Sequence, residues 1–294
     1  METQENGDGW VAFCADTVDV AREMPEHSVD YSVFSPPFAS LYTYSNSPRD
    51  MGNVRDSKEF FEHYRFLIKE TSRVMRPGRN VSIHCMLLPT SKERHGVIGL
   101  YDFRGDIIRA YEAEGFKFHS EVVIWKDPVT AMQRTKALGL LWKQVKKDSA
   151  MSRQGIPDYV VTMRAPGVNT KPISHTADEY PVSLWQKIAS PVWTDINPSD
   201  TLQYQSAREQ DDERHICPLQ LEVIRRCVRL WSSPGDLVWS PFMGIGSEGF
   251  VALHEKRRFV GAELKRGYFE QAIKNLARVE AGLGQAGLFA EVAE

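Results

Sequence analysis

The sequence predicts an α/β fold built around a mostly parallel sheet with helices on both faces. Apolar runs of strand length alternate with amphipathic runs of helix length along most of the 294 residues, which is typical of βαβ units. A strand also runs directly into a glycine-rich turn and a helix at 237–256. Residues 127–157 and 165–215 interrupt the alternation, and we expect them to form small irregular insertions on one rim of the sheet.

The predicted elements follow one another in a regular order. A strand at 11–16 is followed by a short amphipathic segment at 17–25. A buried strand at 29–35 precedes a helix at 57–75, whose apolar residues recur at helical spacing and which stops at Pro77-Gly78. The other expected strands are 79–87, 118–125, 158–164, 237–240 and 257–264, and the other expected helices are 102–116, 219–231, 247–256 and 267–280.

Composition and charge narrow the class of protein. The opening residues lack the basic and apolar regions of a secretory signal, and no apolar run is long enough to span a membrane, so we expect a cytoplasmic protein. The four cysteines are scattered and have no histidine at ligand spacing, which predicts reduced thiols and no metal site. The net charge of −3 does not by itself indicate a nucleic-acid partner.

The charge is nevertheless uneven along the chain. Residues 126–164 hold eight Lys or Arg and three Asp, a local net charge of +5. Such a basic segment on an acidic chain is the pattern of a phosphate-binding face, although a solvated helix face explains it equally well.

The strand at 29–35 ends in Ser35-Pro36-Pro37-Phe38. Proline has no N–H for a sheet and fixes φ, so the strand stops here and the following backbone is rigid. One interpretation is a stiff turn. The other is that the strand delivers a hydroxyl, a fixed carbonyl and an aromatic face to one place.

The glycine-rich turn has the spacing G-x-G-x-x-G, beginning at Gly244, and Glu263 follows at the end of the next strand. Glycines let the backbone approach a ligand, a helix N-terminus attracts anions, and the acid can accept ribose hydroxyls. A tight βα turn is the plainer interpretation. Only about fifty residues follow Gly244, which is short for a dinucleotide fold, so the pattern favours S-adenosylmethionine over NAD; an NAD(P)-dependent oxidoreductase stays a remote alternative.

With both motifs in hand, the chain resembles the DNA amino-methyltransferases, whose signatures are a (D/N/S)-P-P-(Y/F) motif and an F-x-G-x-G loop. Here these are Ser35-Pro36-Pro37-Phe38 and Phe242-Met243-Gly244-Ile245-Gly246, in the order of the β group. Two features depart from the family pattern: Ser240 stands where an Asp is common, and Ile216-Cys217 stands where a proline often follows the histidine. Within the family, the chain is most similar to short methyltransferases of Mu-like prophages, some of which are adenine-specific with little sequence preference.

The resemblance implies a Rossmann-like class I methyltransferase fold with circularly permuted motif order. It implies a catalytic half at 1–126, a basic insert for DNA contact at 127–214 that includes the strand near 158–164, and a cofactor-binding half at 215–294. It also implies S-adenosylmethionine as cofactor, double-stranded DNA as partner, no metal, and a bacterial or phage-encoded enzyme that forms homodimers. Protection of phage DNA from restriction is the role expected from it.

The resemblance and the motifs together give the candidate site residues. The catalytic candidates are Ser35, Pro36, Pro37 and Phe38. The cofactor candidates are Asp16, Ser240, Phe242, Gly244, Gly246, Ser247, Glu263 and His215. The DNA-contact candidates are Arg134, Lys136, Lys143, Lys146, Lys147 and Arg153. Structural roles stay open as alternatives, because Asp16 and Ser247 can cap helices and His215 can be structural.

These residues suggest a mechanism. The exocyclic amine of a base is a poor nucleophile because its lone pair is conjugated with the ring. The Ser35 oxygen and the Pro36 carbonyl would accept its N–H groups and localise the lone pair, while Phe38 stacks on the flipped base. Serine cannot readily keep the proton, so we expect water or bulk solvent to remove it.

Two arguments disagree about the base. Serine at the first motif position is typical of N4-cytosine enzymes, whereas the chain-wide resemblance to the prophage enzymes favours N6-adenine. We expect N6-adenine with low sequence specificity, and N4-cytosine is the alternative.

Overall fold

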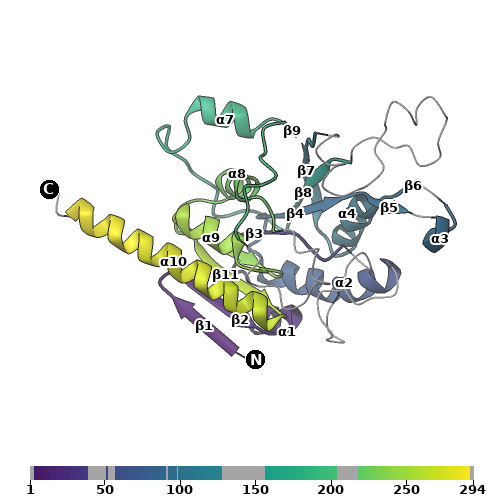
Figure 1. Ribbon diagram of the computed structural model, residues 1–294, viewed down its shortest axis with the longest axis horizontal. Helices are drawn as coiled ribbons and strands as arrows, with labels where there is room; N and C mark the ends of the chain where they lie inside the picture. The colour runs from purple at the N-terminus through teal and green to yellow at the C-terminus, as the bar shows by residue number, and fades with distance from the viewer. Residues whose placement is uncertain are drawn as a thin grey trace.

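A mixed β-sheet is the frame of the protein in the computed structural model, which describes residues 3–38, 51, 57–90, 92–97, 99–127, 156–203 and 218–291. Within these residues the sheet has the strand order β1-β2-β11-β10-β3-β4-β8-β7-β9 (Figure 1). Its strands are β1 (Thr3–Gly7), β2 (Trp10–Cys14), β3 (Tyr31–Phe34), β4 (Asn80–Met86), β7 (Lys117–Ile124), β8 (Asp158–Arg164), β9 (Val192–Trp193), β10 (Leu237–Ser240) and β11 (Arg258–Glu263).

Helices lie before, between and after these strands. They are α1 (Thr17–Glu23), α2 (Ser57–Val74), α3 (Lys92–His95), α4 (Phe103–Ala113), α7 (Val182–Ile188), α8 (Leu221–Trp231), α9 (Ser247–His254) and α10 (Arg266–Glu291). A small separate hairpin joins β5 (Leu88–Thr90) to β6 (Gly99–Tyr101). Each strand and helix expected from the sequence has a counterpart here, with its bounds shifted by a few residues except at α10, which continues to Glu291.

The centre of the sheet is parallel. β2, β11, β10, β3 and β4 pair in parallel, whereas β8 runs antiparallel between β4 and β7. The prediction of a mostly parallel α/β sheet is therefore confirmed. The reversal of β8 pairs Asp158, its first residue, with Met86, the last residue of β4. The start of β8 thus lies at the edge where the parallel strands end.

The direction of the chain along the sheet switches between β3 and β10. From β3 the chain passes through α2 to β4, and from β10 it passes through α9 to β11 on the other side. The loops that leave the carboxyl ends of these two neighbouring strands therefore diverge. Open α/β sheets bind ligands in the crevice at such a point.

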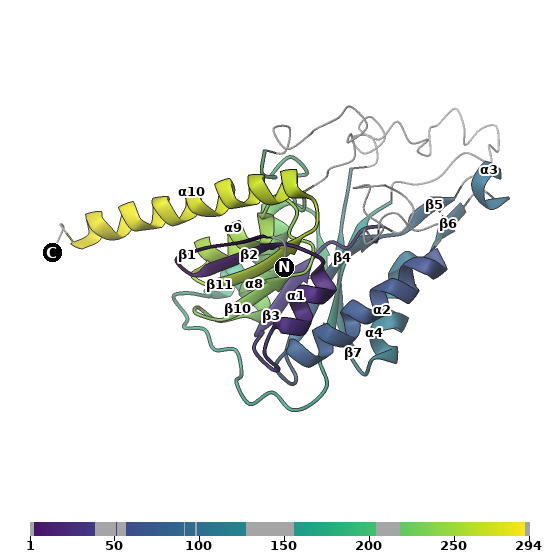
Figure 2. The same ribbon diagram turned by 90° about the horizontal axis from the view of Figure 1, so that it is seen from below.

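Helices cover both faces of the sheet, as Figure 2 shows. α1, α2 and α4 contribute to one hydrophobic cluster, and α8, α9 and α10 contribute to the other. β3 serves both clusters, because Phe34 packs in the first while Tyr31 and Val33 pack in the second. The apolar run of β3 is thus explained by burial on both faces.

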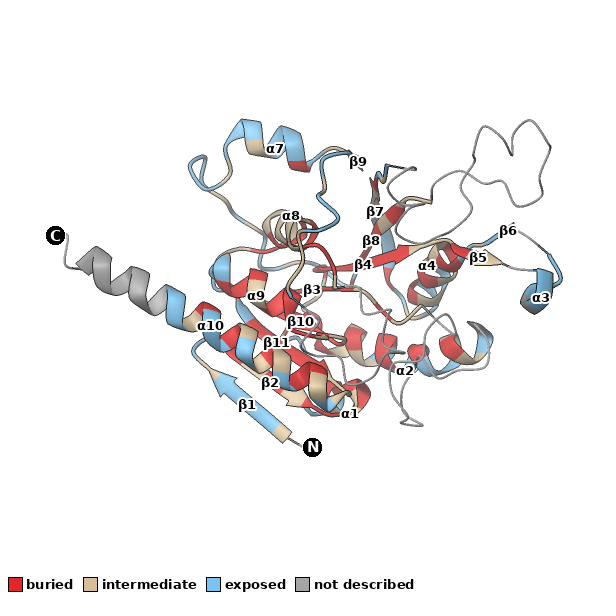
Figure 3. Cartoon of the chain, in the orientation of Figure 1, coloured by how far each residue is buried: buried red, intermediate tan, exposed pale blue. Residues whose placement is uncertain are grey.

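The sequence pattern does not predict β1, α7 or β9. β1 pairs antiparallel with β2 at one edge, but its residues TQENG form no apolar run and are mostly exposed. The expected irregular stretch 165–215 contains α7 and β9, and β9 extends the opposite edge. Figure 3 shows the exposed surfaces of β1 and α7. Neither β1 nor α7 buries a periodic apolar stripe, which is why the pattern missed them.

No described helix has the length and apolar character needed to cross a membrane.

Candidate active site

The candidate site lies at the carboxyl ends of the parallel strands. Ser35 directly follows β3, and Ser240 is the last residue of β10. Glu263 ends β11, and Asp16 follows β2. His84 lies near the end of β4. The topology thus brings residues that are far apart in the sequence to the carboxyl ends of the parallel strands.

Two contacts hold β3 and β10 together just below this edge. The hydroxyl of Ser32 donates to the carbonyl of Trp239 at 2.8 Å, and both residues are fully buried. The rings of Phe34 and Phe242 pack with centroids 5.7 Å apart. The loop beginning at Ser35 therefore leaves the sheet beside the glycine-rich loop.

The Ser35-Pro36-Pro37-Phe38 loop combines buried backbone with partly open side chains. Pro36 is buried, whereas Ser35 and Phe38 are half-buried. The Phe38 ring lies 6.2 Å from the His84 ring and meets the edge of Phe103 at 6.0 Å. One hydroxyl and one aromatic ring are thus presented at the same edge by a rigid turn.

Ser35 is connected to groups on two further strands. Its Oγ lies 3.1 Å from His84 Nδ1. His84 Nε2 lies 3.1 Å from Asp158 Oδ2, within ion-pair distance. The angle between the two groups does not meet the criterion for a hydrogen bond. Lys126 Nζ lies 2.6 Å from the same Asp158 oxygen. The serine is therefore the outer end of a chain of polar side chains that leads into the sheet.

Asp158 is charged at this position. Burial opposes the charge, but the contact with His84 and the nearby charge of Lys126 outweigh it and lower the pKa of Asp158 below its ordinary value. The carboxylate is 3% exposed, so it interacts with these partners in a medium where charges act strongly.

The glycine-rich loop is open on its outer side. Gly244 has φ +52°, and a Cβ built there would meet nothing within 4 Å. Gly246 has φ +85° and is the N-cap of α9, so no side chain caps the helix. The carboxylate of Glu263 accepts from the backbone N–H of Gly244 at 3.0 Å and of Lys265 at 2.7 Å. The backbone at Gly244 is therefore open to close approach by a ligand, whereas a Cβ at Gly246 would lie 3.2 Å from Ala272.

The first turn of α9 is buried. Ser247 and Glu248 are 3% and 4% exposed. Burial, with the nearby charge of Glu263, raises the pKa of Glu248 to about 8 although its own backbone N–H lowers it. Gly249 lies so close to Phe259 and Leu276 that a Cβ would approach them to 2.6 Å. The third glycine therefore permits close packing of the helix rather than ligand contact.

These groups fit a nucleoside that carries a carboxylate. Ser240 Oγ is fully buried and has no hydrogen-bond partner in the described part of the chain. The N-terminus of α9 has no side-chain cap and suits an anion, and a carboxylate such as that of Glu263 can accept several hydrogen bonds. Gly244, where a Cβ would meet only open space, lies in the sequence between Ser240 and the start of α9.

Some candidate residues have structural partners of their own. Asp16 Oδ1 accepts from the backbone N–H groups of Val18 and Asp19, at 2.8 and 3.4 Å, so the capping alternative is realised. Phe242 packs against Phe34 and also lies 6.4 Å from the Tyr64 ring. His215 lies outside the described residues. The same holds for the DNA-contact candidates Arg134, Lys136, Lys143, Lys146, Lys147 and Arg153.

Sequence reasoning missed His84, Asp158 and Lys126. A signal was present, because His84 falls near the carboxyl end of a predicted strand and Asp158 opens another. It becomes informative only once β8 is known to run antiparallel, which brings the start of that strand to the same edge. Lys126 belongs to the basic segment by its sequence position, and its charge faces Asp158.

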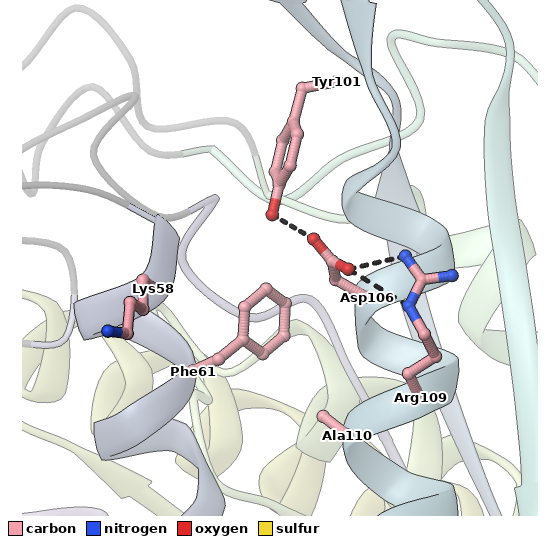
Figure 4. Close-up of a pocket in the computed structure, with 6 residues that line it drawn as sticks. All are labelled: Lys58, Phe61, Tyr101, Asp106, Arg109 and Ala110. Atoms are coloured by element: carbon pink, nitrogen blue, oxygen red, sulfur yellow. Dashed lines mark hydrogen bonds and ion pairs between the residues drawn. The ribbon is translucent and has the colours of Figure 1, made fainter.

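A surface pocket of about 420 Å³ lies between α2, β6 and α4 (Figure 4). Phe61 and Ala110 form its apolar side. Asp106 accepts from the Tyr101 hydroxyl and pairs with Arg109. The pocket contains none of the candidate site residues. Among the described residues there is also no cluster of side chains able to hold a metal ion.

Comparisons with known proteins agree with this geometry. The model of the N6/N4 methyltransferase family, described as DNA methylase, matches residues 29–274. The chain is similar to the type II methyltransferase M.BglII of Bacillus subtilis, with 22% identity over 90% of this chain and 68% of that protein.

Solved structures share the fold. TTHA0409 of Thermus thermophilus, a putative DNA modification methylase solved with S-adenosyl-L-methionine, has a TM-score of 0.67 and 22% identity over 91% of this chain and 95% of that one. The cytosine-N4-specific PvuII DNA methyltransferase has a TM-score of 0.65 and 16% identity over 91% of this chain and 86% of that one. The expected class I methyltransferase fold is therefore confirmed.

Proposed function

Because this chain belongs to the DNA methylase family of N6/N4 methyltransferases, we propose that its target is the N6 amino group of adenine in DNA, with low sequence specificity. The enzyme is a DNA methyltransferase that uses S-adenosylmethionine. The meeting of the Ser35 loop with the glycine-rich loop at the switch point of the sheet supports methylation of an amino group, and the choice of adenine rests on the chain-wide resemblance to the prophage enzymes.

S-adenosylmethionine supplies an electrophilic methyl group when it is bound. The N-terminus of α9, with Gly244, Gly246 and Ser247, would receive its carboxylate. Glu263 would accept the ribose hydroxyls, and the unpartnered hydroxyl of Ser240 would supply a further polar contact. Asp16 and Phe242 would line the adenosine end, and His215 is retained as a cofactor candidate from the family resemblance.

Ser35 and Pro36 would hold the target amine. Their side-chain and carbonyl oxygens are acceptors for its two N–H groups, and the second proline, Pro37, keeps the turn rigid, so little reorganisation is needed as charge develops. Phe38 would stack on the base, which must leave the duplex to reach this edge. The half-exposed ring of Phe38 is available for such a contact.

The basic segment would contact the DNA backbone. We assign this role to Arg134, Lys136, Lys143, Lys146, Lys147 and Arg153, within the insert at 127–214 between the two halves at 1–126 and 215–294. Phosphate contacts of this kind position DNA without reading its sequence, which agrees with low specificity. A homodimer, and a role in protecting phage DNA from restriction, belong to the same proposal.

The N4 amino group of cytosine is the second candidate. The observation in its favour is that residue 35 is a serine, the residue typical of the N4-cytosine enzymes at this motif position. The two amines are chemically alike, so the Ser35 and Pro36 acceptors serve either one.

Mass spectrometry of nucleosides tests the function. DNA from cells that express the wild type, Ser35→Ala or Ser28→Ala is digested and the modified bases are quantified. Ser28 is a matched control, because its hydroxyl is exposed and bonds only locally to Pro25. We expect N6-methyladenine in the wild type and the control, and background levels in Ser35→Ala.

The outcomes separate the candidates. N4-methylcytosine in place of N6-methyladenine would assign the enzyme to cytosine. The absence of both modified bases from wild-type cells, with the protein folded and expressed, would contradict the proposed function. The fraction of all adenines that are modified measures the sequence specificity.

A further inference from the structure

Two side chains, from β4 and β8, lie in line behind the Ser35 hydroxyl. Ser35 follows β3, His84 is in β4 and Asp158 begins β8. The two contacts in this line each measure 3.1 Å. His84 and Asp158 are 9% and 3% exposed. Burying an imidazole and a carboxylate is costly unless each faces a suitable partner, so their alignment with Ser35 needs an explanation.

The chemistry of the groups sets the direction of the hydrogen bonds. A carboxylate can only accept, so the ring nitrogen that faces Asp158, Nε2, is the one that carries the proton. Nδ1 is then an acceptor, and the Ser35 hydroxyl donates to it. The lone pairs of Ser35 Oγ remain for the N–H groups of a target amine.

Hydrolases with a serine nucleophile use the same three side-chain types, but they also need an oxyanion-binding site. Such enzymes stabilise an oxyanion with backbone N–H groups next to the serine. The two residues after Ser35 are prolines, which have no N–H. The set is therefore unsuited to acyl transfer and suits proton removal.

We infer that His84 and Asp158 are positioning residues that receive, through Ser35, the proton which the target amine loses on methylation. The inference rests on the proposed function and replaces the expectation that solvent alone takes this proton. The new nitrogen–carbon bond forms as the methyl–sulfur bond breaks, and the nitrogen then carries one excess proton. That proton passes to Ser35 Oγ while the Ser35 proton passes to His84 Nδ1.

The relay ends on an imidazolium beside a carboxylate. Serine regains its hydroxyl, and the added positive charge of His84 faces Asp158, which is already ionised. An imidazole can take a proton on one ring nitrogen and later release a proton to water. Lys126 on the far side of Asp158 holds the carboxylate in place.

Nuclear magnetic resonance of the ligand-free protein, labelled with ¹⁵N in its histidines, tests the direction of the relay without an activity measurement. His84 is assigned from its loss in His84→Gln. We expect a protonated Nε2 and an unprotonated, hydrogen-bonded Nδ1, and we expect Asp158→Asn to weaken this preference. A wild-type His84 protonated on Nδ1 would overturn the inference.

Chemical rescue tests the proton transfer itself. We expect His84→Ala to lower the single-turnover rate of methyl transfer roughly 100-fold or more, with the KM values for cofactor and DNA changed much less. Added imidazole should restore the rate in proportion to its concentration. His119→Ala is the matched control, because His119 Nδ1 also lies 3.0 Å from a serine hydroxyl, that of Ser120, on the exposed surface.

The results have distinct meanings. A folded His84→Ala or His84→Gln that keeps the wild-type rate, or a slow His84→Ala that imidazole does not restore, contradicts the relay. If His84→Ala does not fold, His84→Gln and Asp158→Asn still give the rate comparison. A folded wild type that methylates no base in DNA contradicts the proposed function instead.

Discussion

The hydroxyl of Ser32 donates a hydrogen bond of 2.8 Å to the carbonyl oxygen of Trp239, a residue 207 positions later in the chain. Ser32 lies in β3 and Trp239 is its direct partner in β10. The bond therefore crosslinks the strand that carries the Ser35 loop to the strand that carries the glycine-rich loop. Together with the parallel pairing of the two strands, this buried contact sets where the two loops leave the sheet.

Replacement of Ser32 by alanine should weaken the fold. The substitution removes a buried hydrogen bond without adding volume, and we expect the free energy of unfolding to fall by about 1–2 kcal/mol. Urea denaturation measures the change. Ser28→Ala removes an exposed, local hydrogen bond and should cost less than about 0.5 kcal/mol. Equal stability of the two variants would show that the Ser32 contact contributes nothing specific.

Replacement of Gly244 by alanine should impair cofactor binding. Gly244 and Gly235 both have positive φ and open space where a Cβ would stand, so each substitution should cost a similar 1–2 kcal/mol, roughly, in stability. Only Gly244 borders the candidate cofactor site. Calorimetry should therefore show S-adenosylmethionine binding about tenfold or more weaker for Gly244→Ala and unchanged for Gly235→Ala. Equal affinities would remove Gly244 from the site.

Glu248 should make stability depend on pH. Folding raises the pKa of this carboxyl from an ordinary 4.5 to about 8, so its protonated form stabilises the fold below pH 4.5 and this contribution is lost as the pH rises to 8. Glu248→Gln removes the titration. The variant should be more stable than the wild type at pH 8 by on the order of 4 kcal/mol, and the difference should shrink towards pH 5. Thermal unfolding at both pH values checks this, and a constant difference would contradict it.

A buried ion pair lies at the amino ends of the parallel strands, whereas the candidate site lies at their carboxyl ends. Arg79 donates to Asp236 at 2.6 Å, and each side chain is 1% exposed. Lys171 bridges Asp236 and Asp30 at 2.7 and 3.2 Å. Burial opposes the charge of Asp236, but the hydrogen bond from Lys171 and the other partners lower its pKa. These groups join the beginnings of β3, β4 and β10.

Asp236→Ala should therefore be strongly destabilising. The variant leaves the Arg79 charge buried without its partner, which costs about 3–5 kcal/mol. The exposed pair of Arg266 and Glu270 provides the comparison, since Arg266→Ala should cost less than about 0.5 kcal/mol. Guanidinium denaturation distinguishes the two. Similar small losses would show that water reaches Arg79 in the variant.

The sequence was sufficient for the parts of the fold with strong patterns. β3, β10 and β11 are apolar runs between turn residues, and the glycine spacing at 244–249 marks the start of α9. Because each of these patterns is local, neighbouring residues alone specify the element. The meeting of the Ser35 loop and the glycine-rich loop also followed, since parallel strands end at one edge.

The rest of the site depends on contacts that no local pattern encodes. The pairing of His84 with Asp158 requires the antiparallel direction of β8, and strand direction is set by the whole sheet rather than by the residues of one strand. Asp16 illustrates a different limit. Its position before α1 suits both a helix cap and a ligand contact, and the structure contains the cap.

The pairing of β3 with β10 also has a consequence for protein synthesis. A ribosome makes β10 and the helix α8 that covers Tyr31 and Val33 about two hundred residues after β3. Until then, β3 is an edge strand with an uncovered apolar face, the kind of surface that aggregates or recruits chaperones. A nascent chain interrupted before Leu237 thus carries the complete Ser35 motif without the strand that pairs beside it.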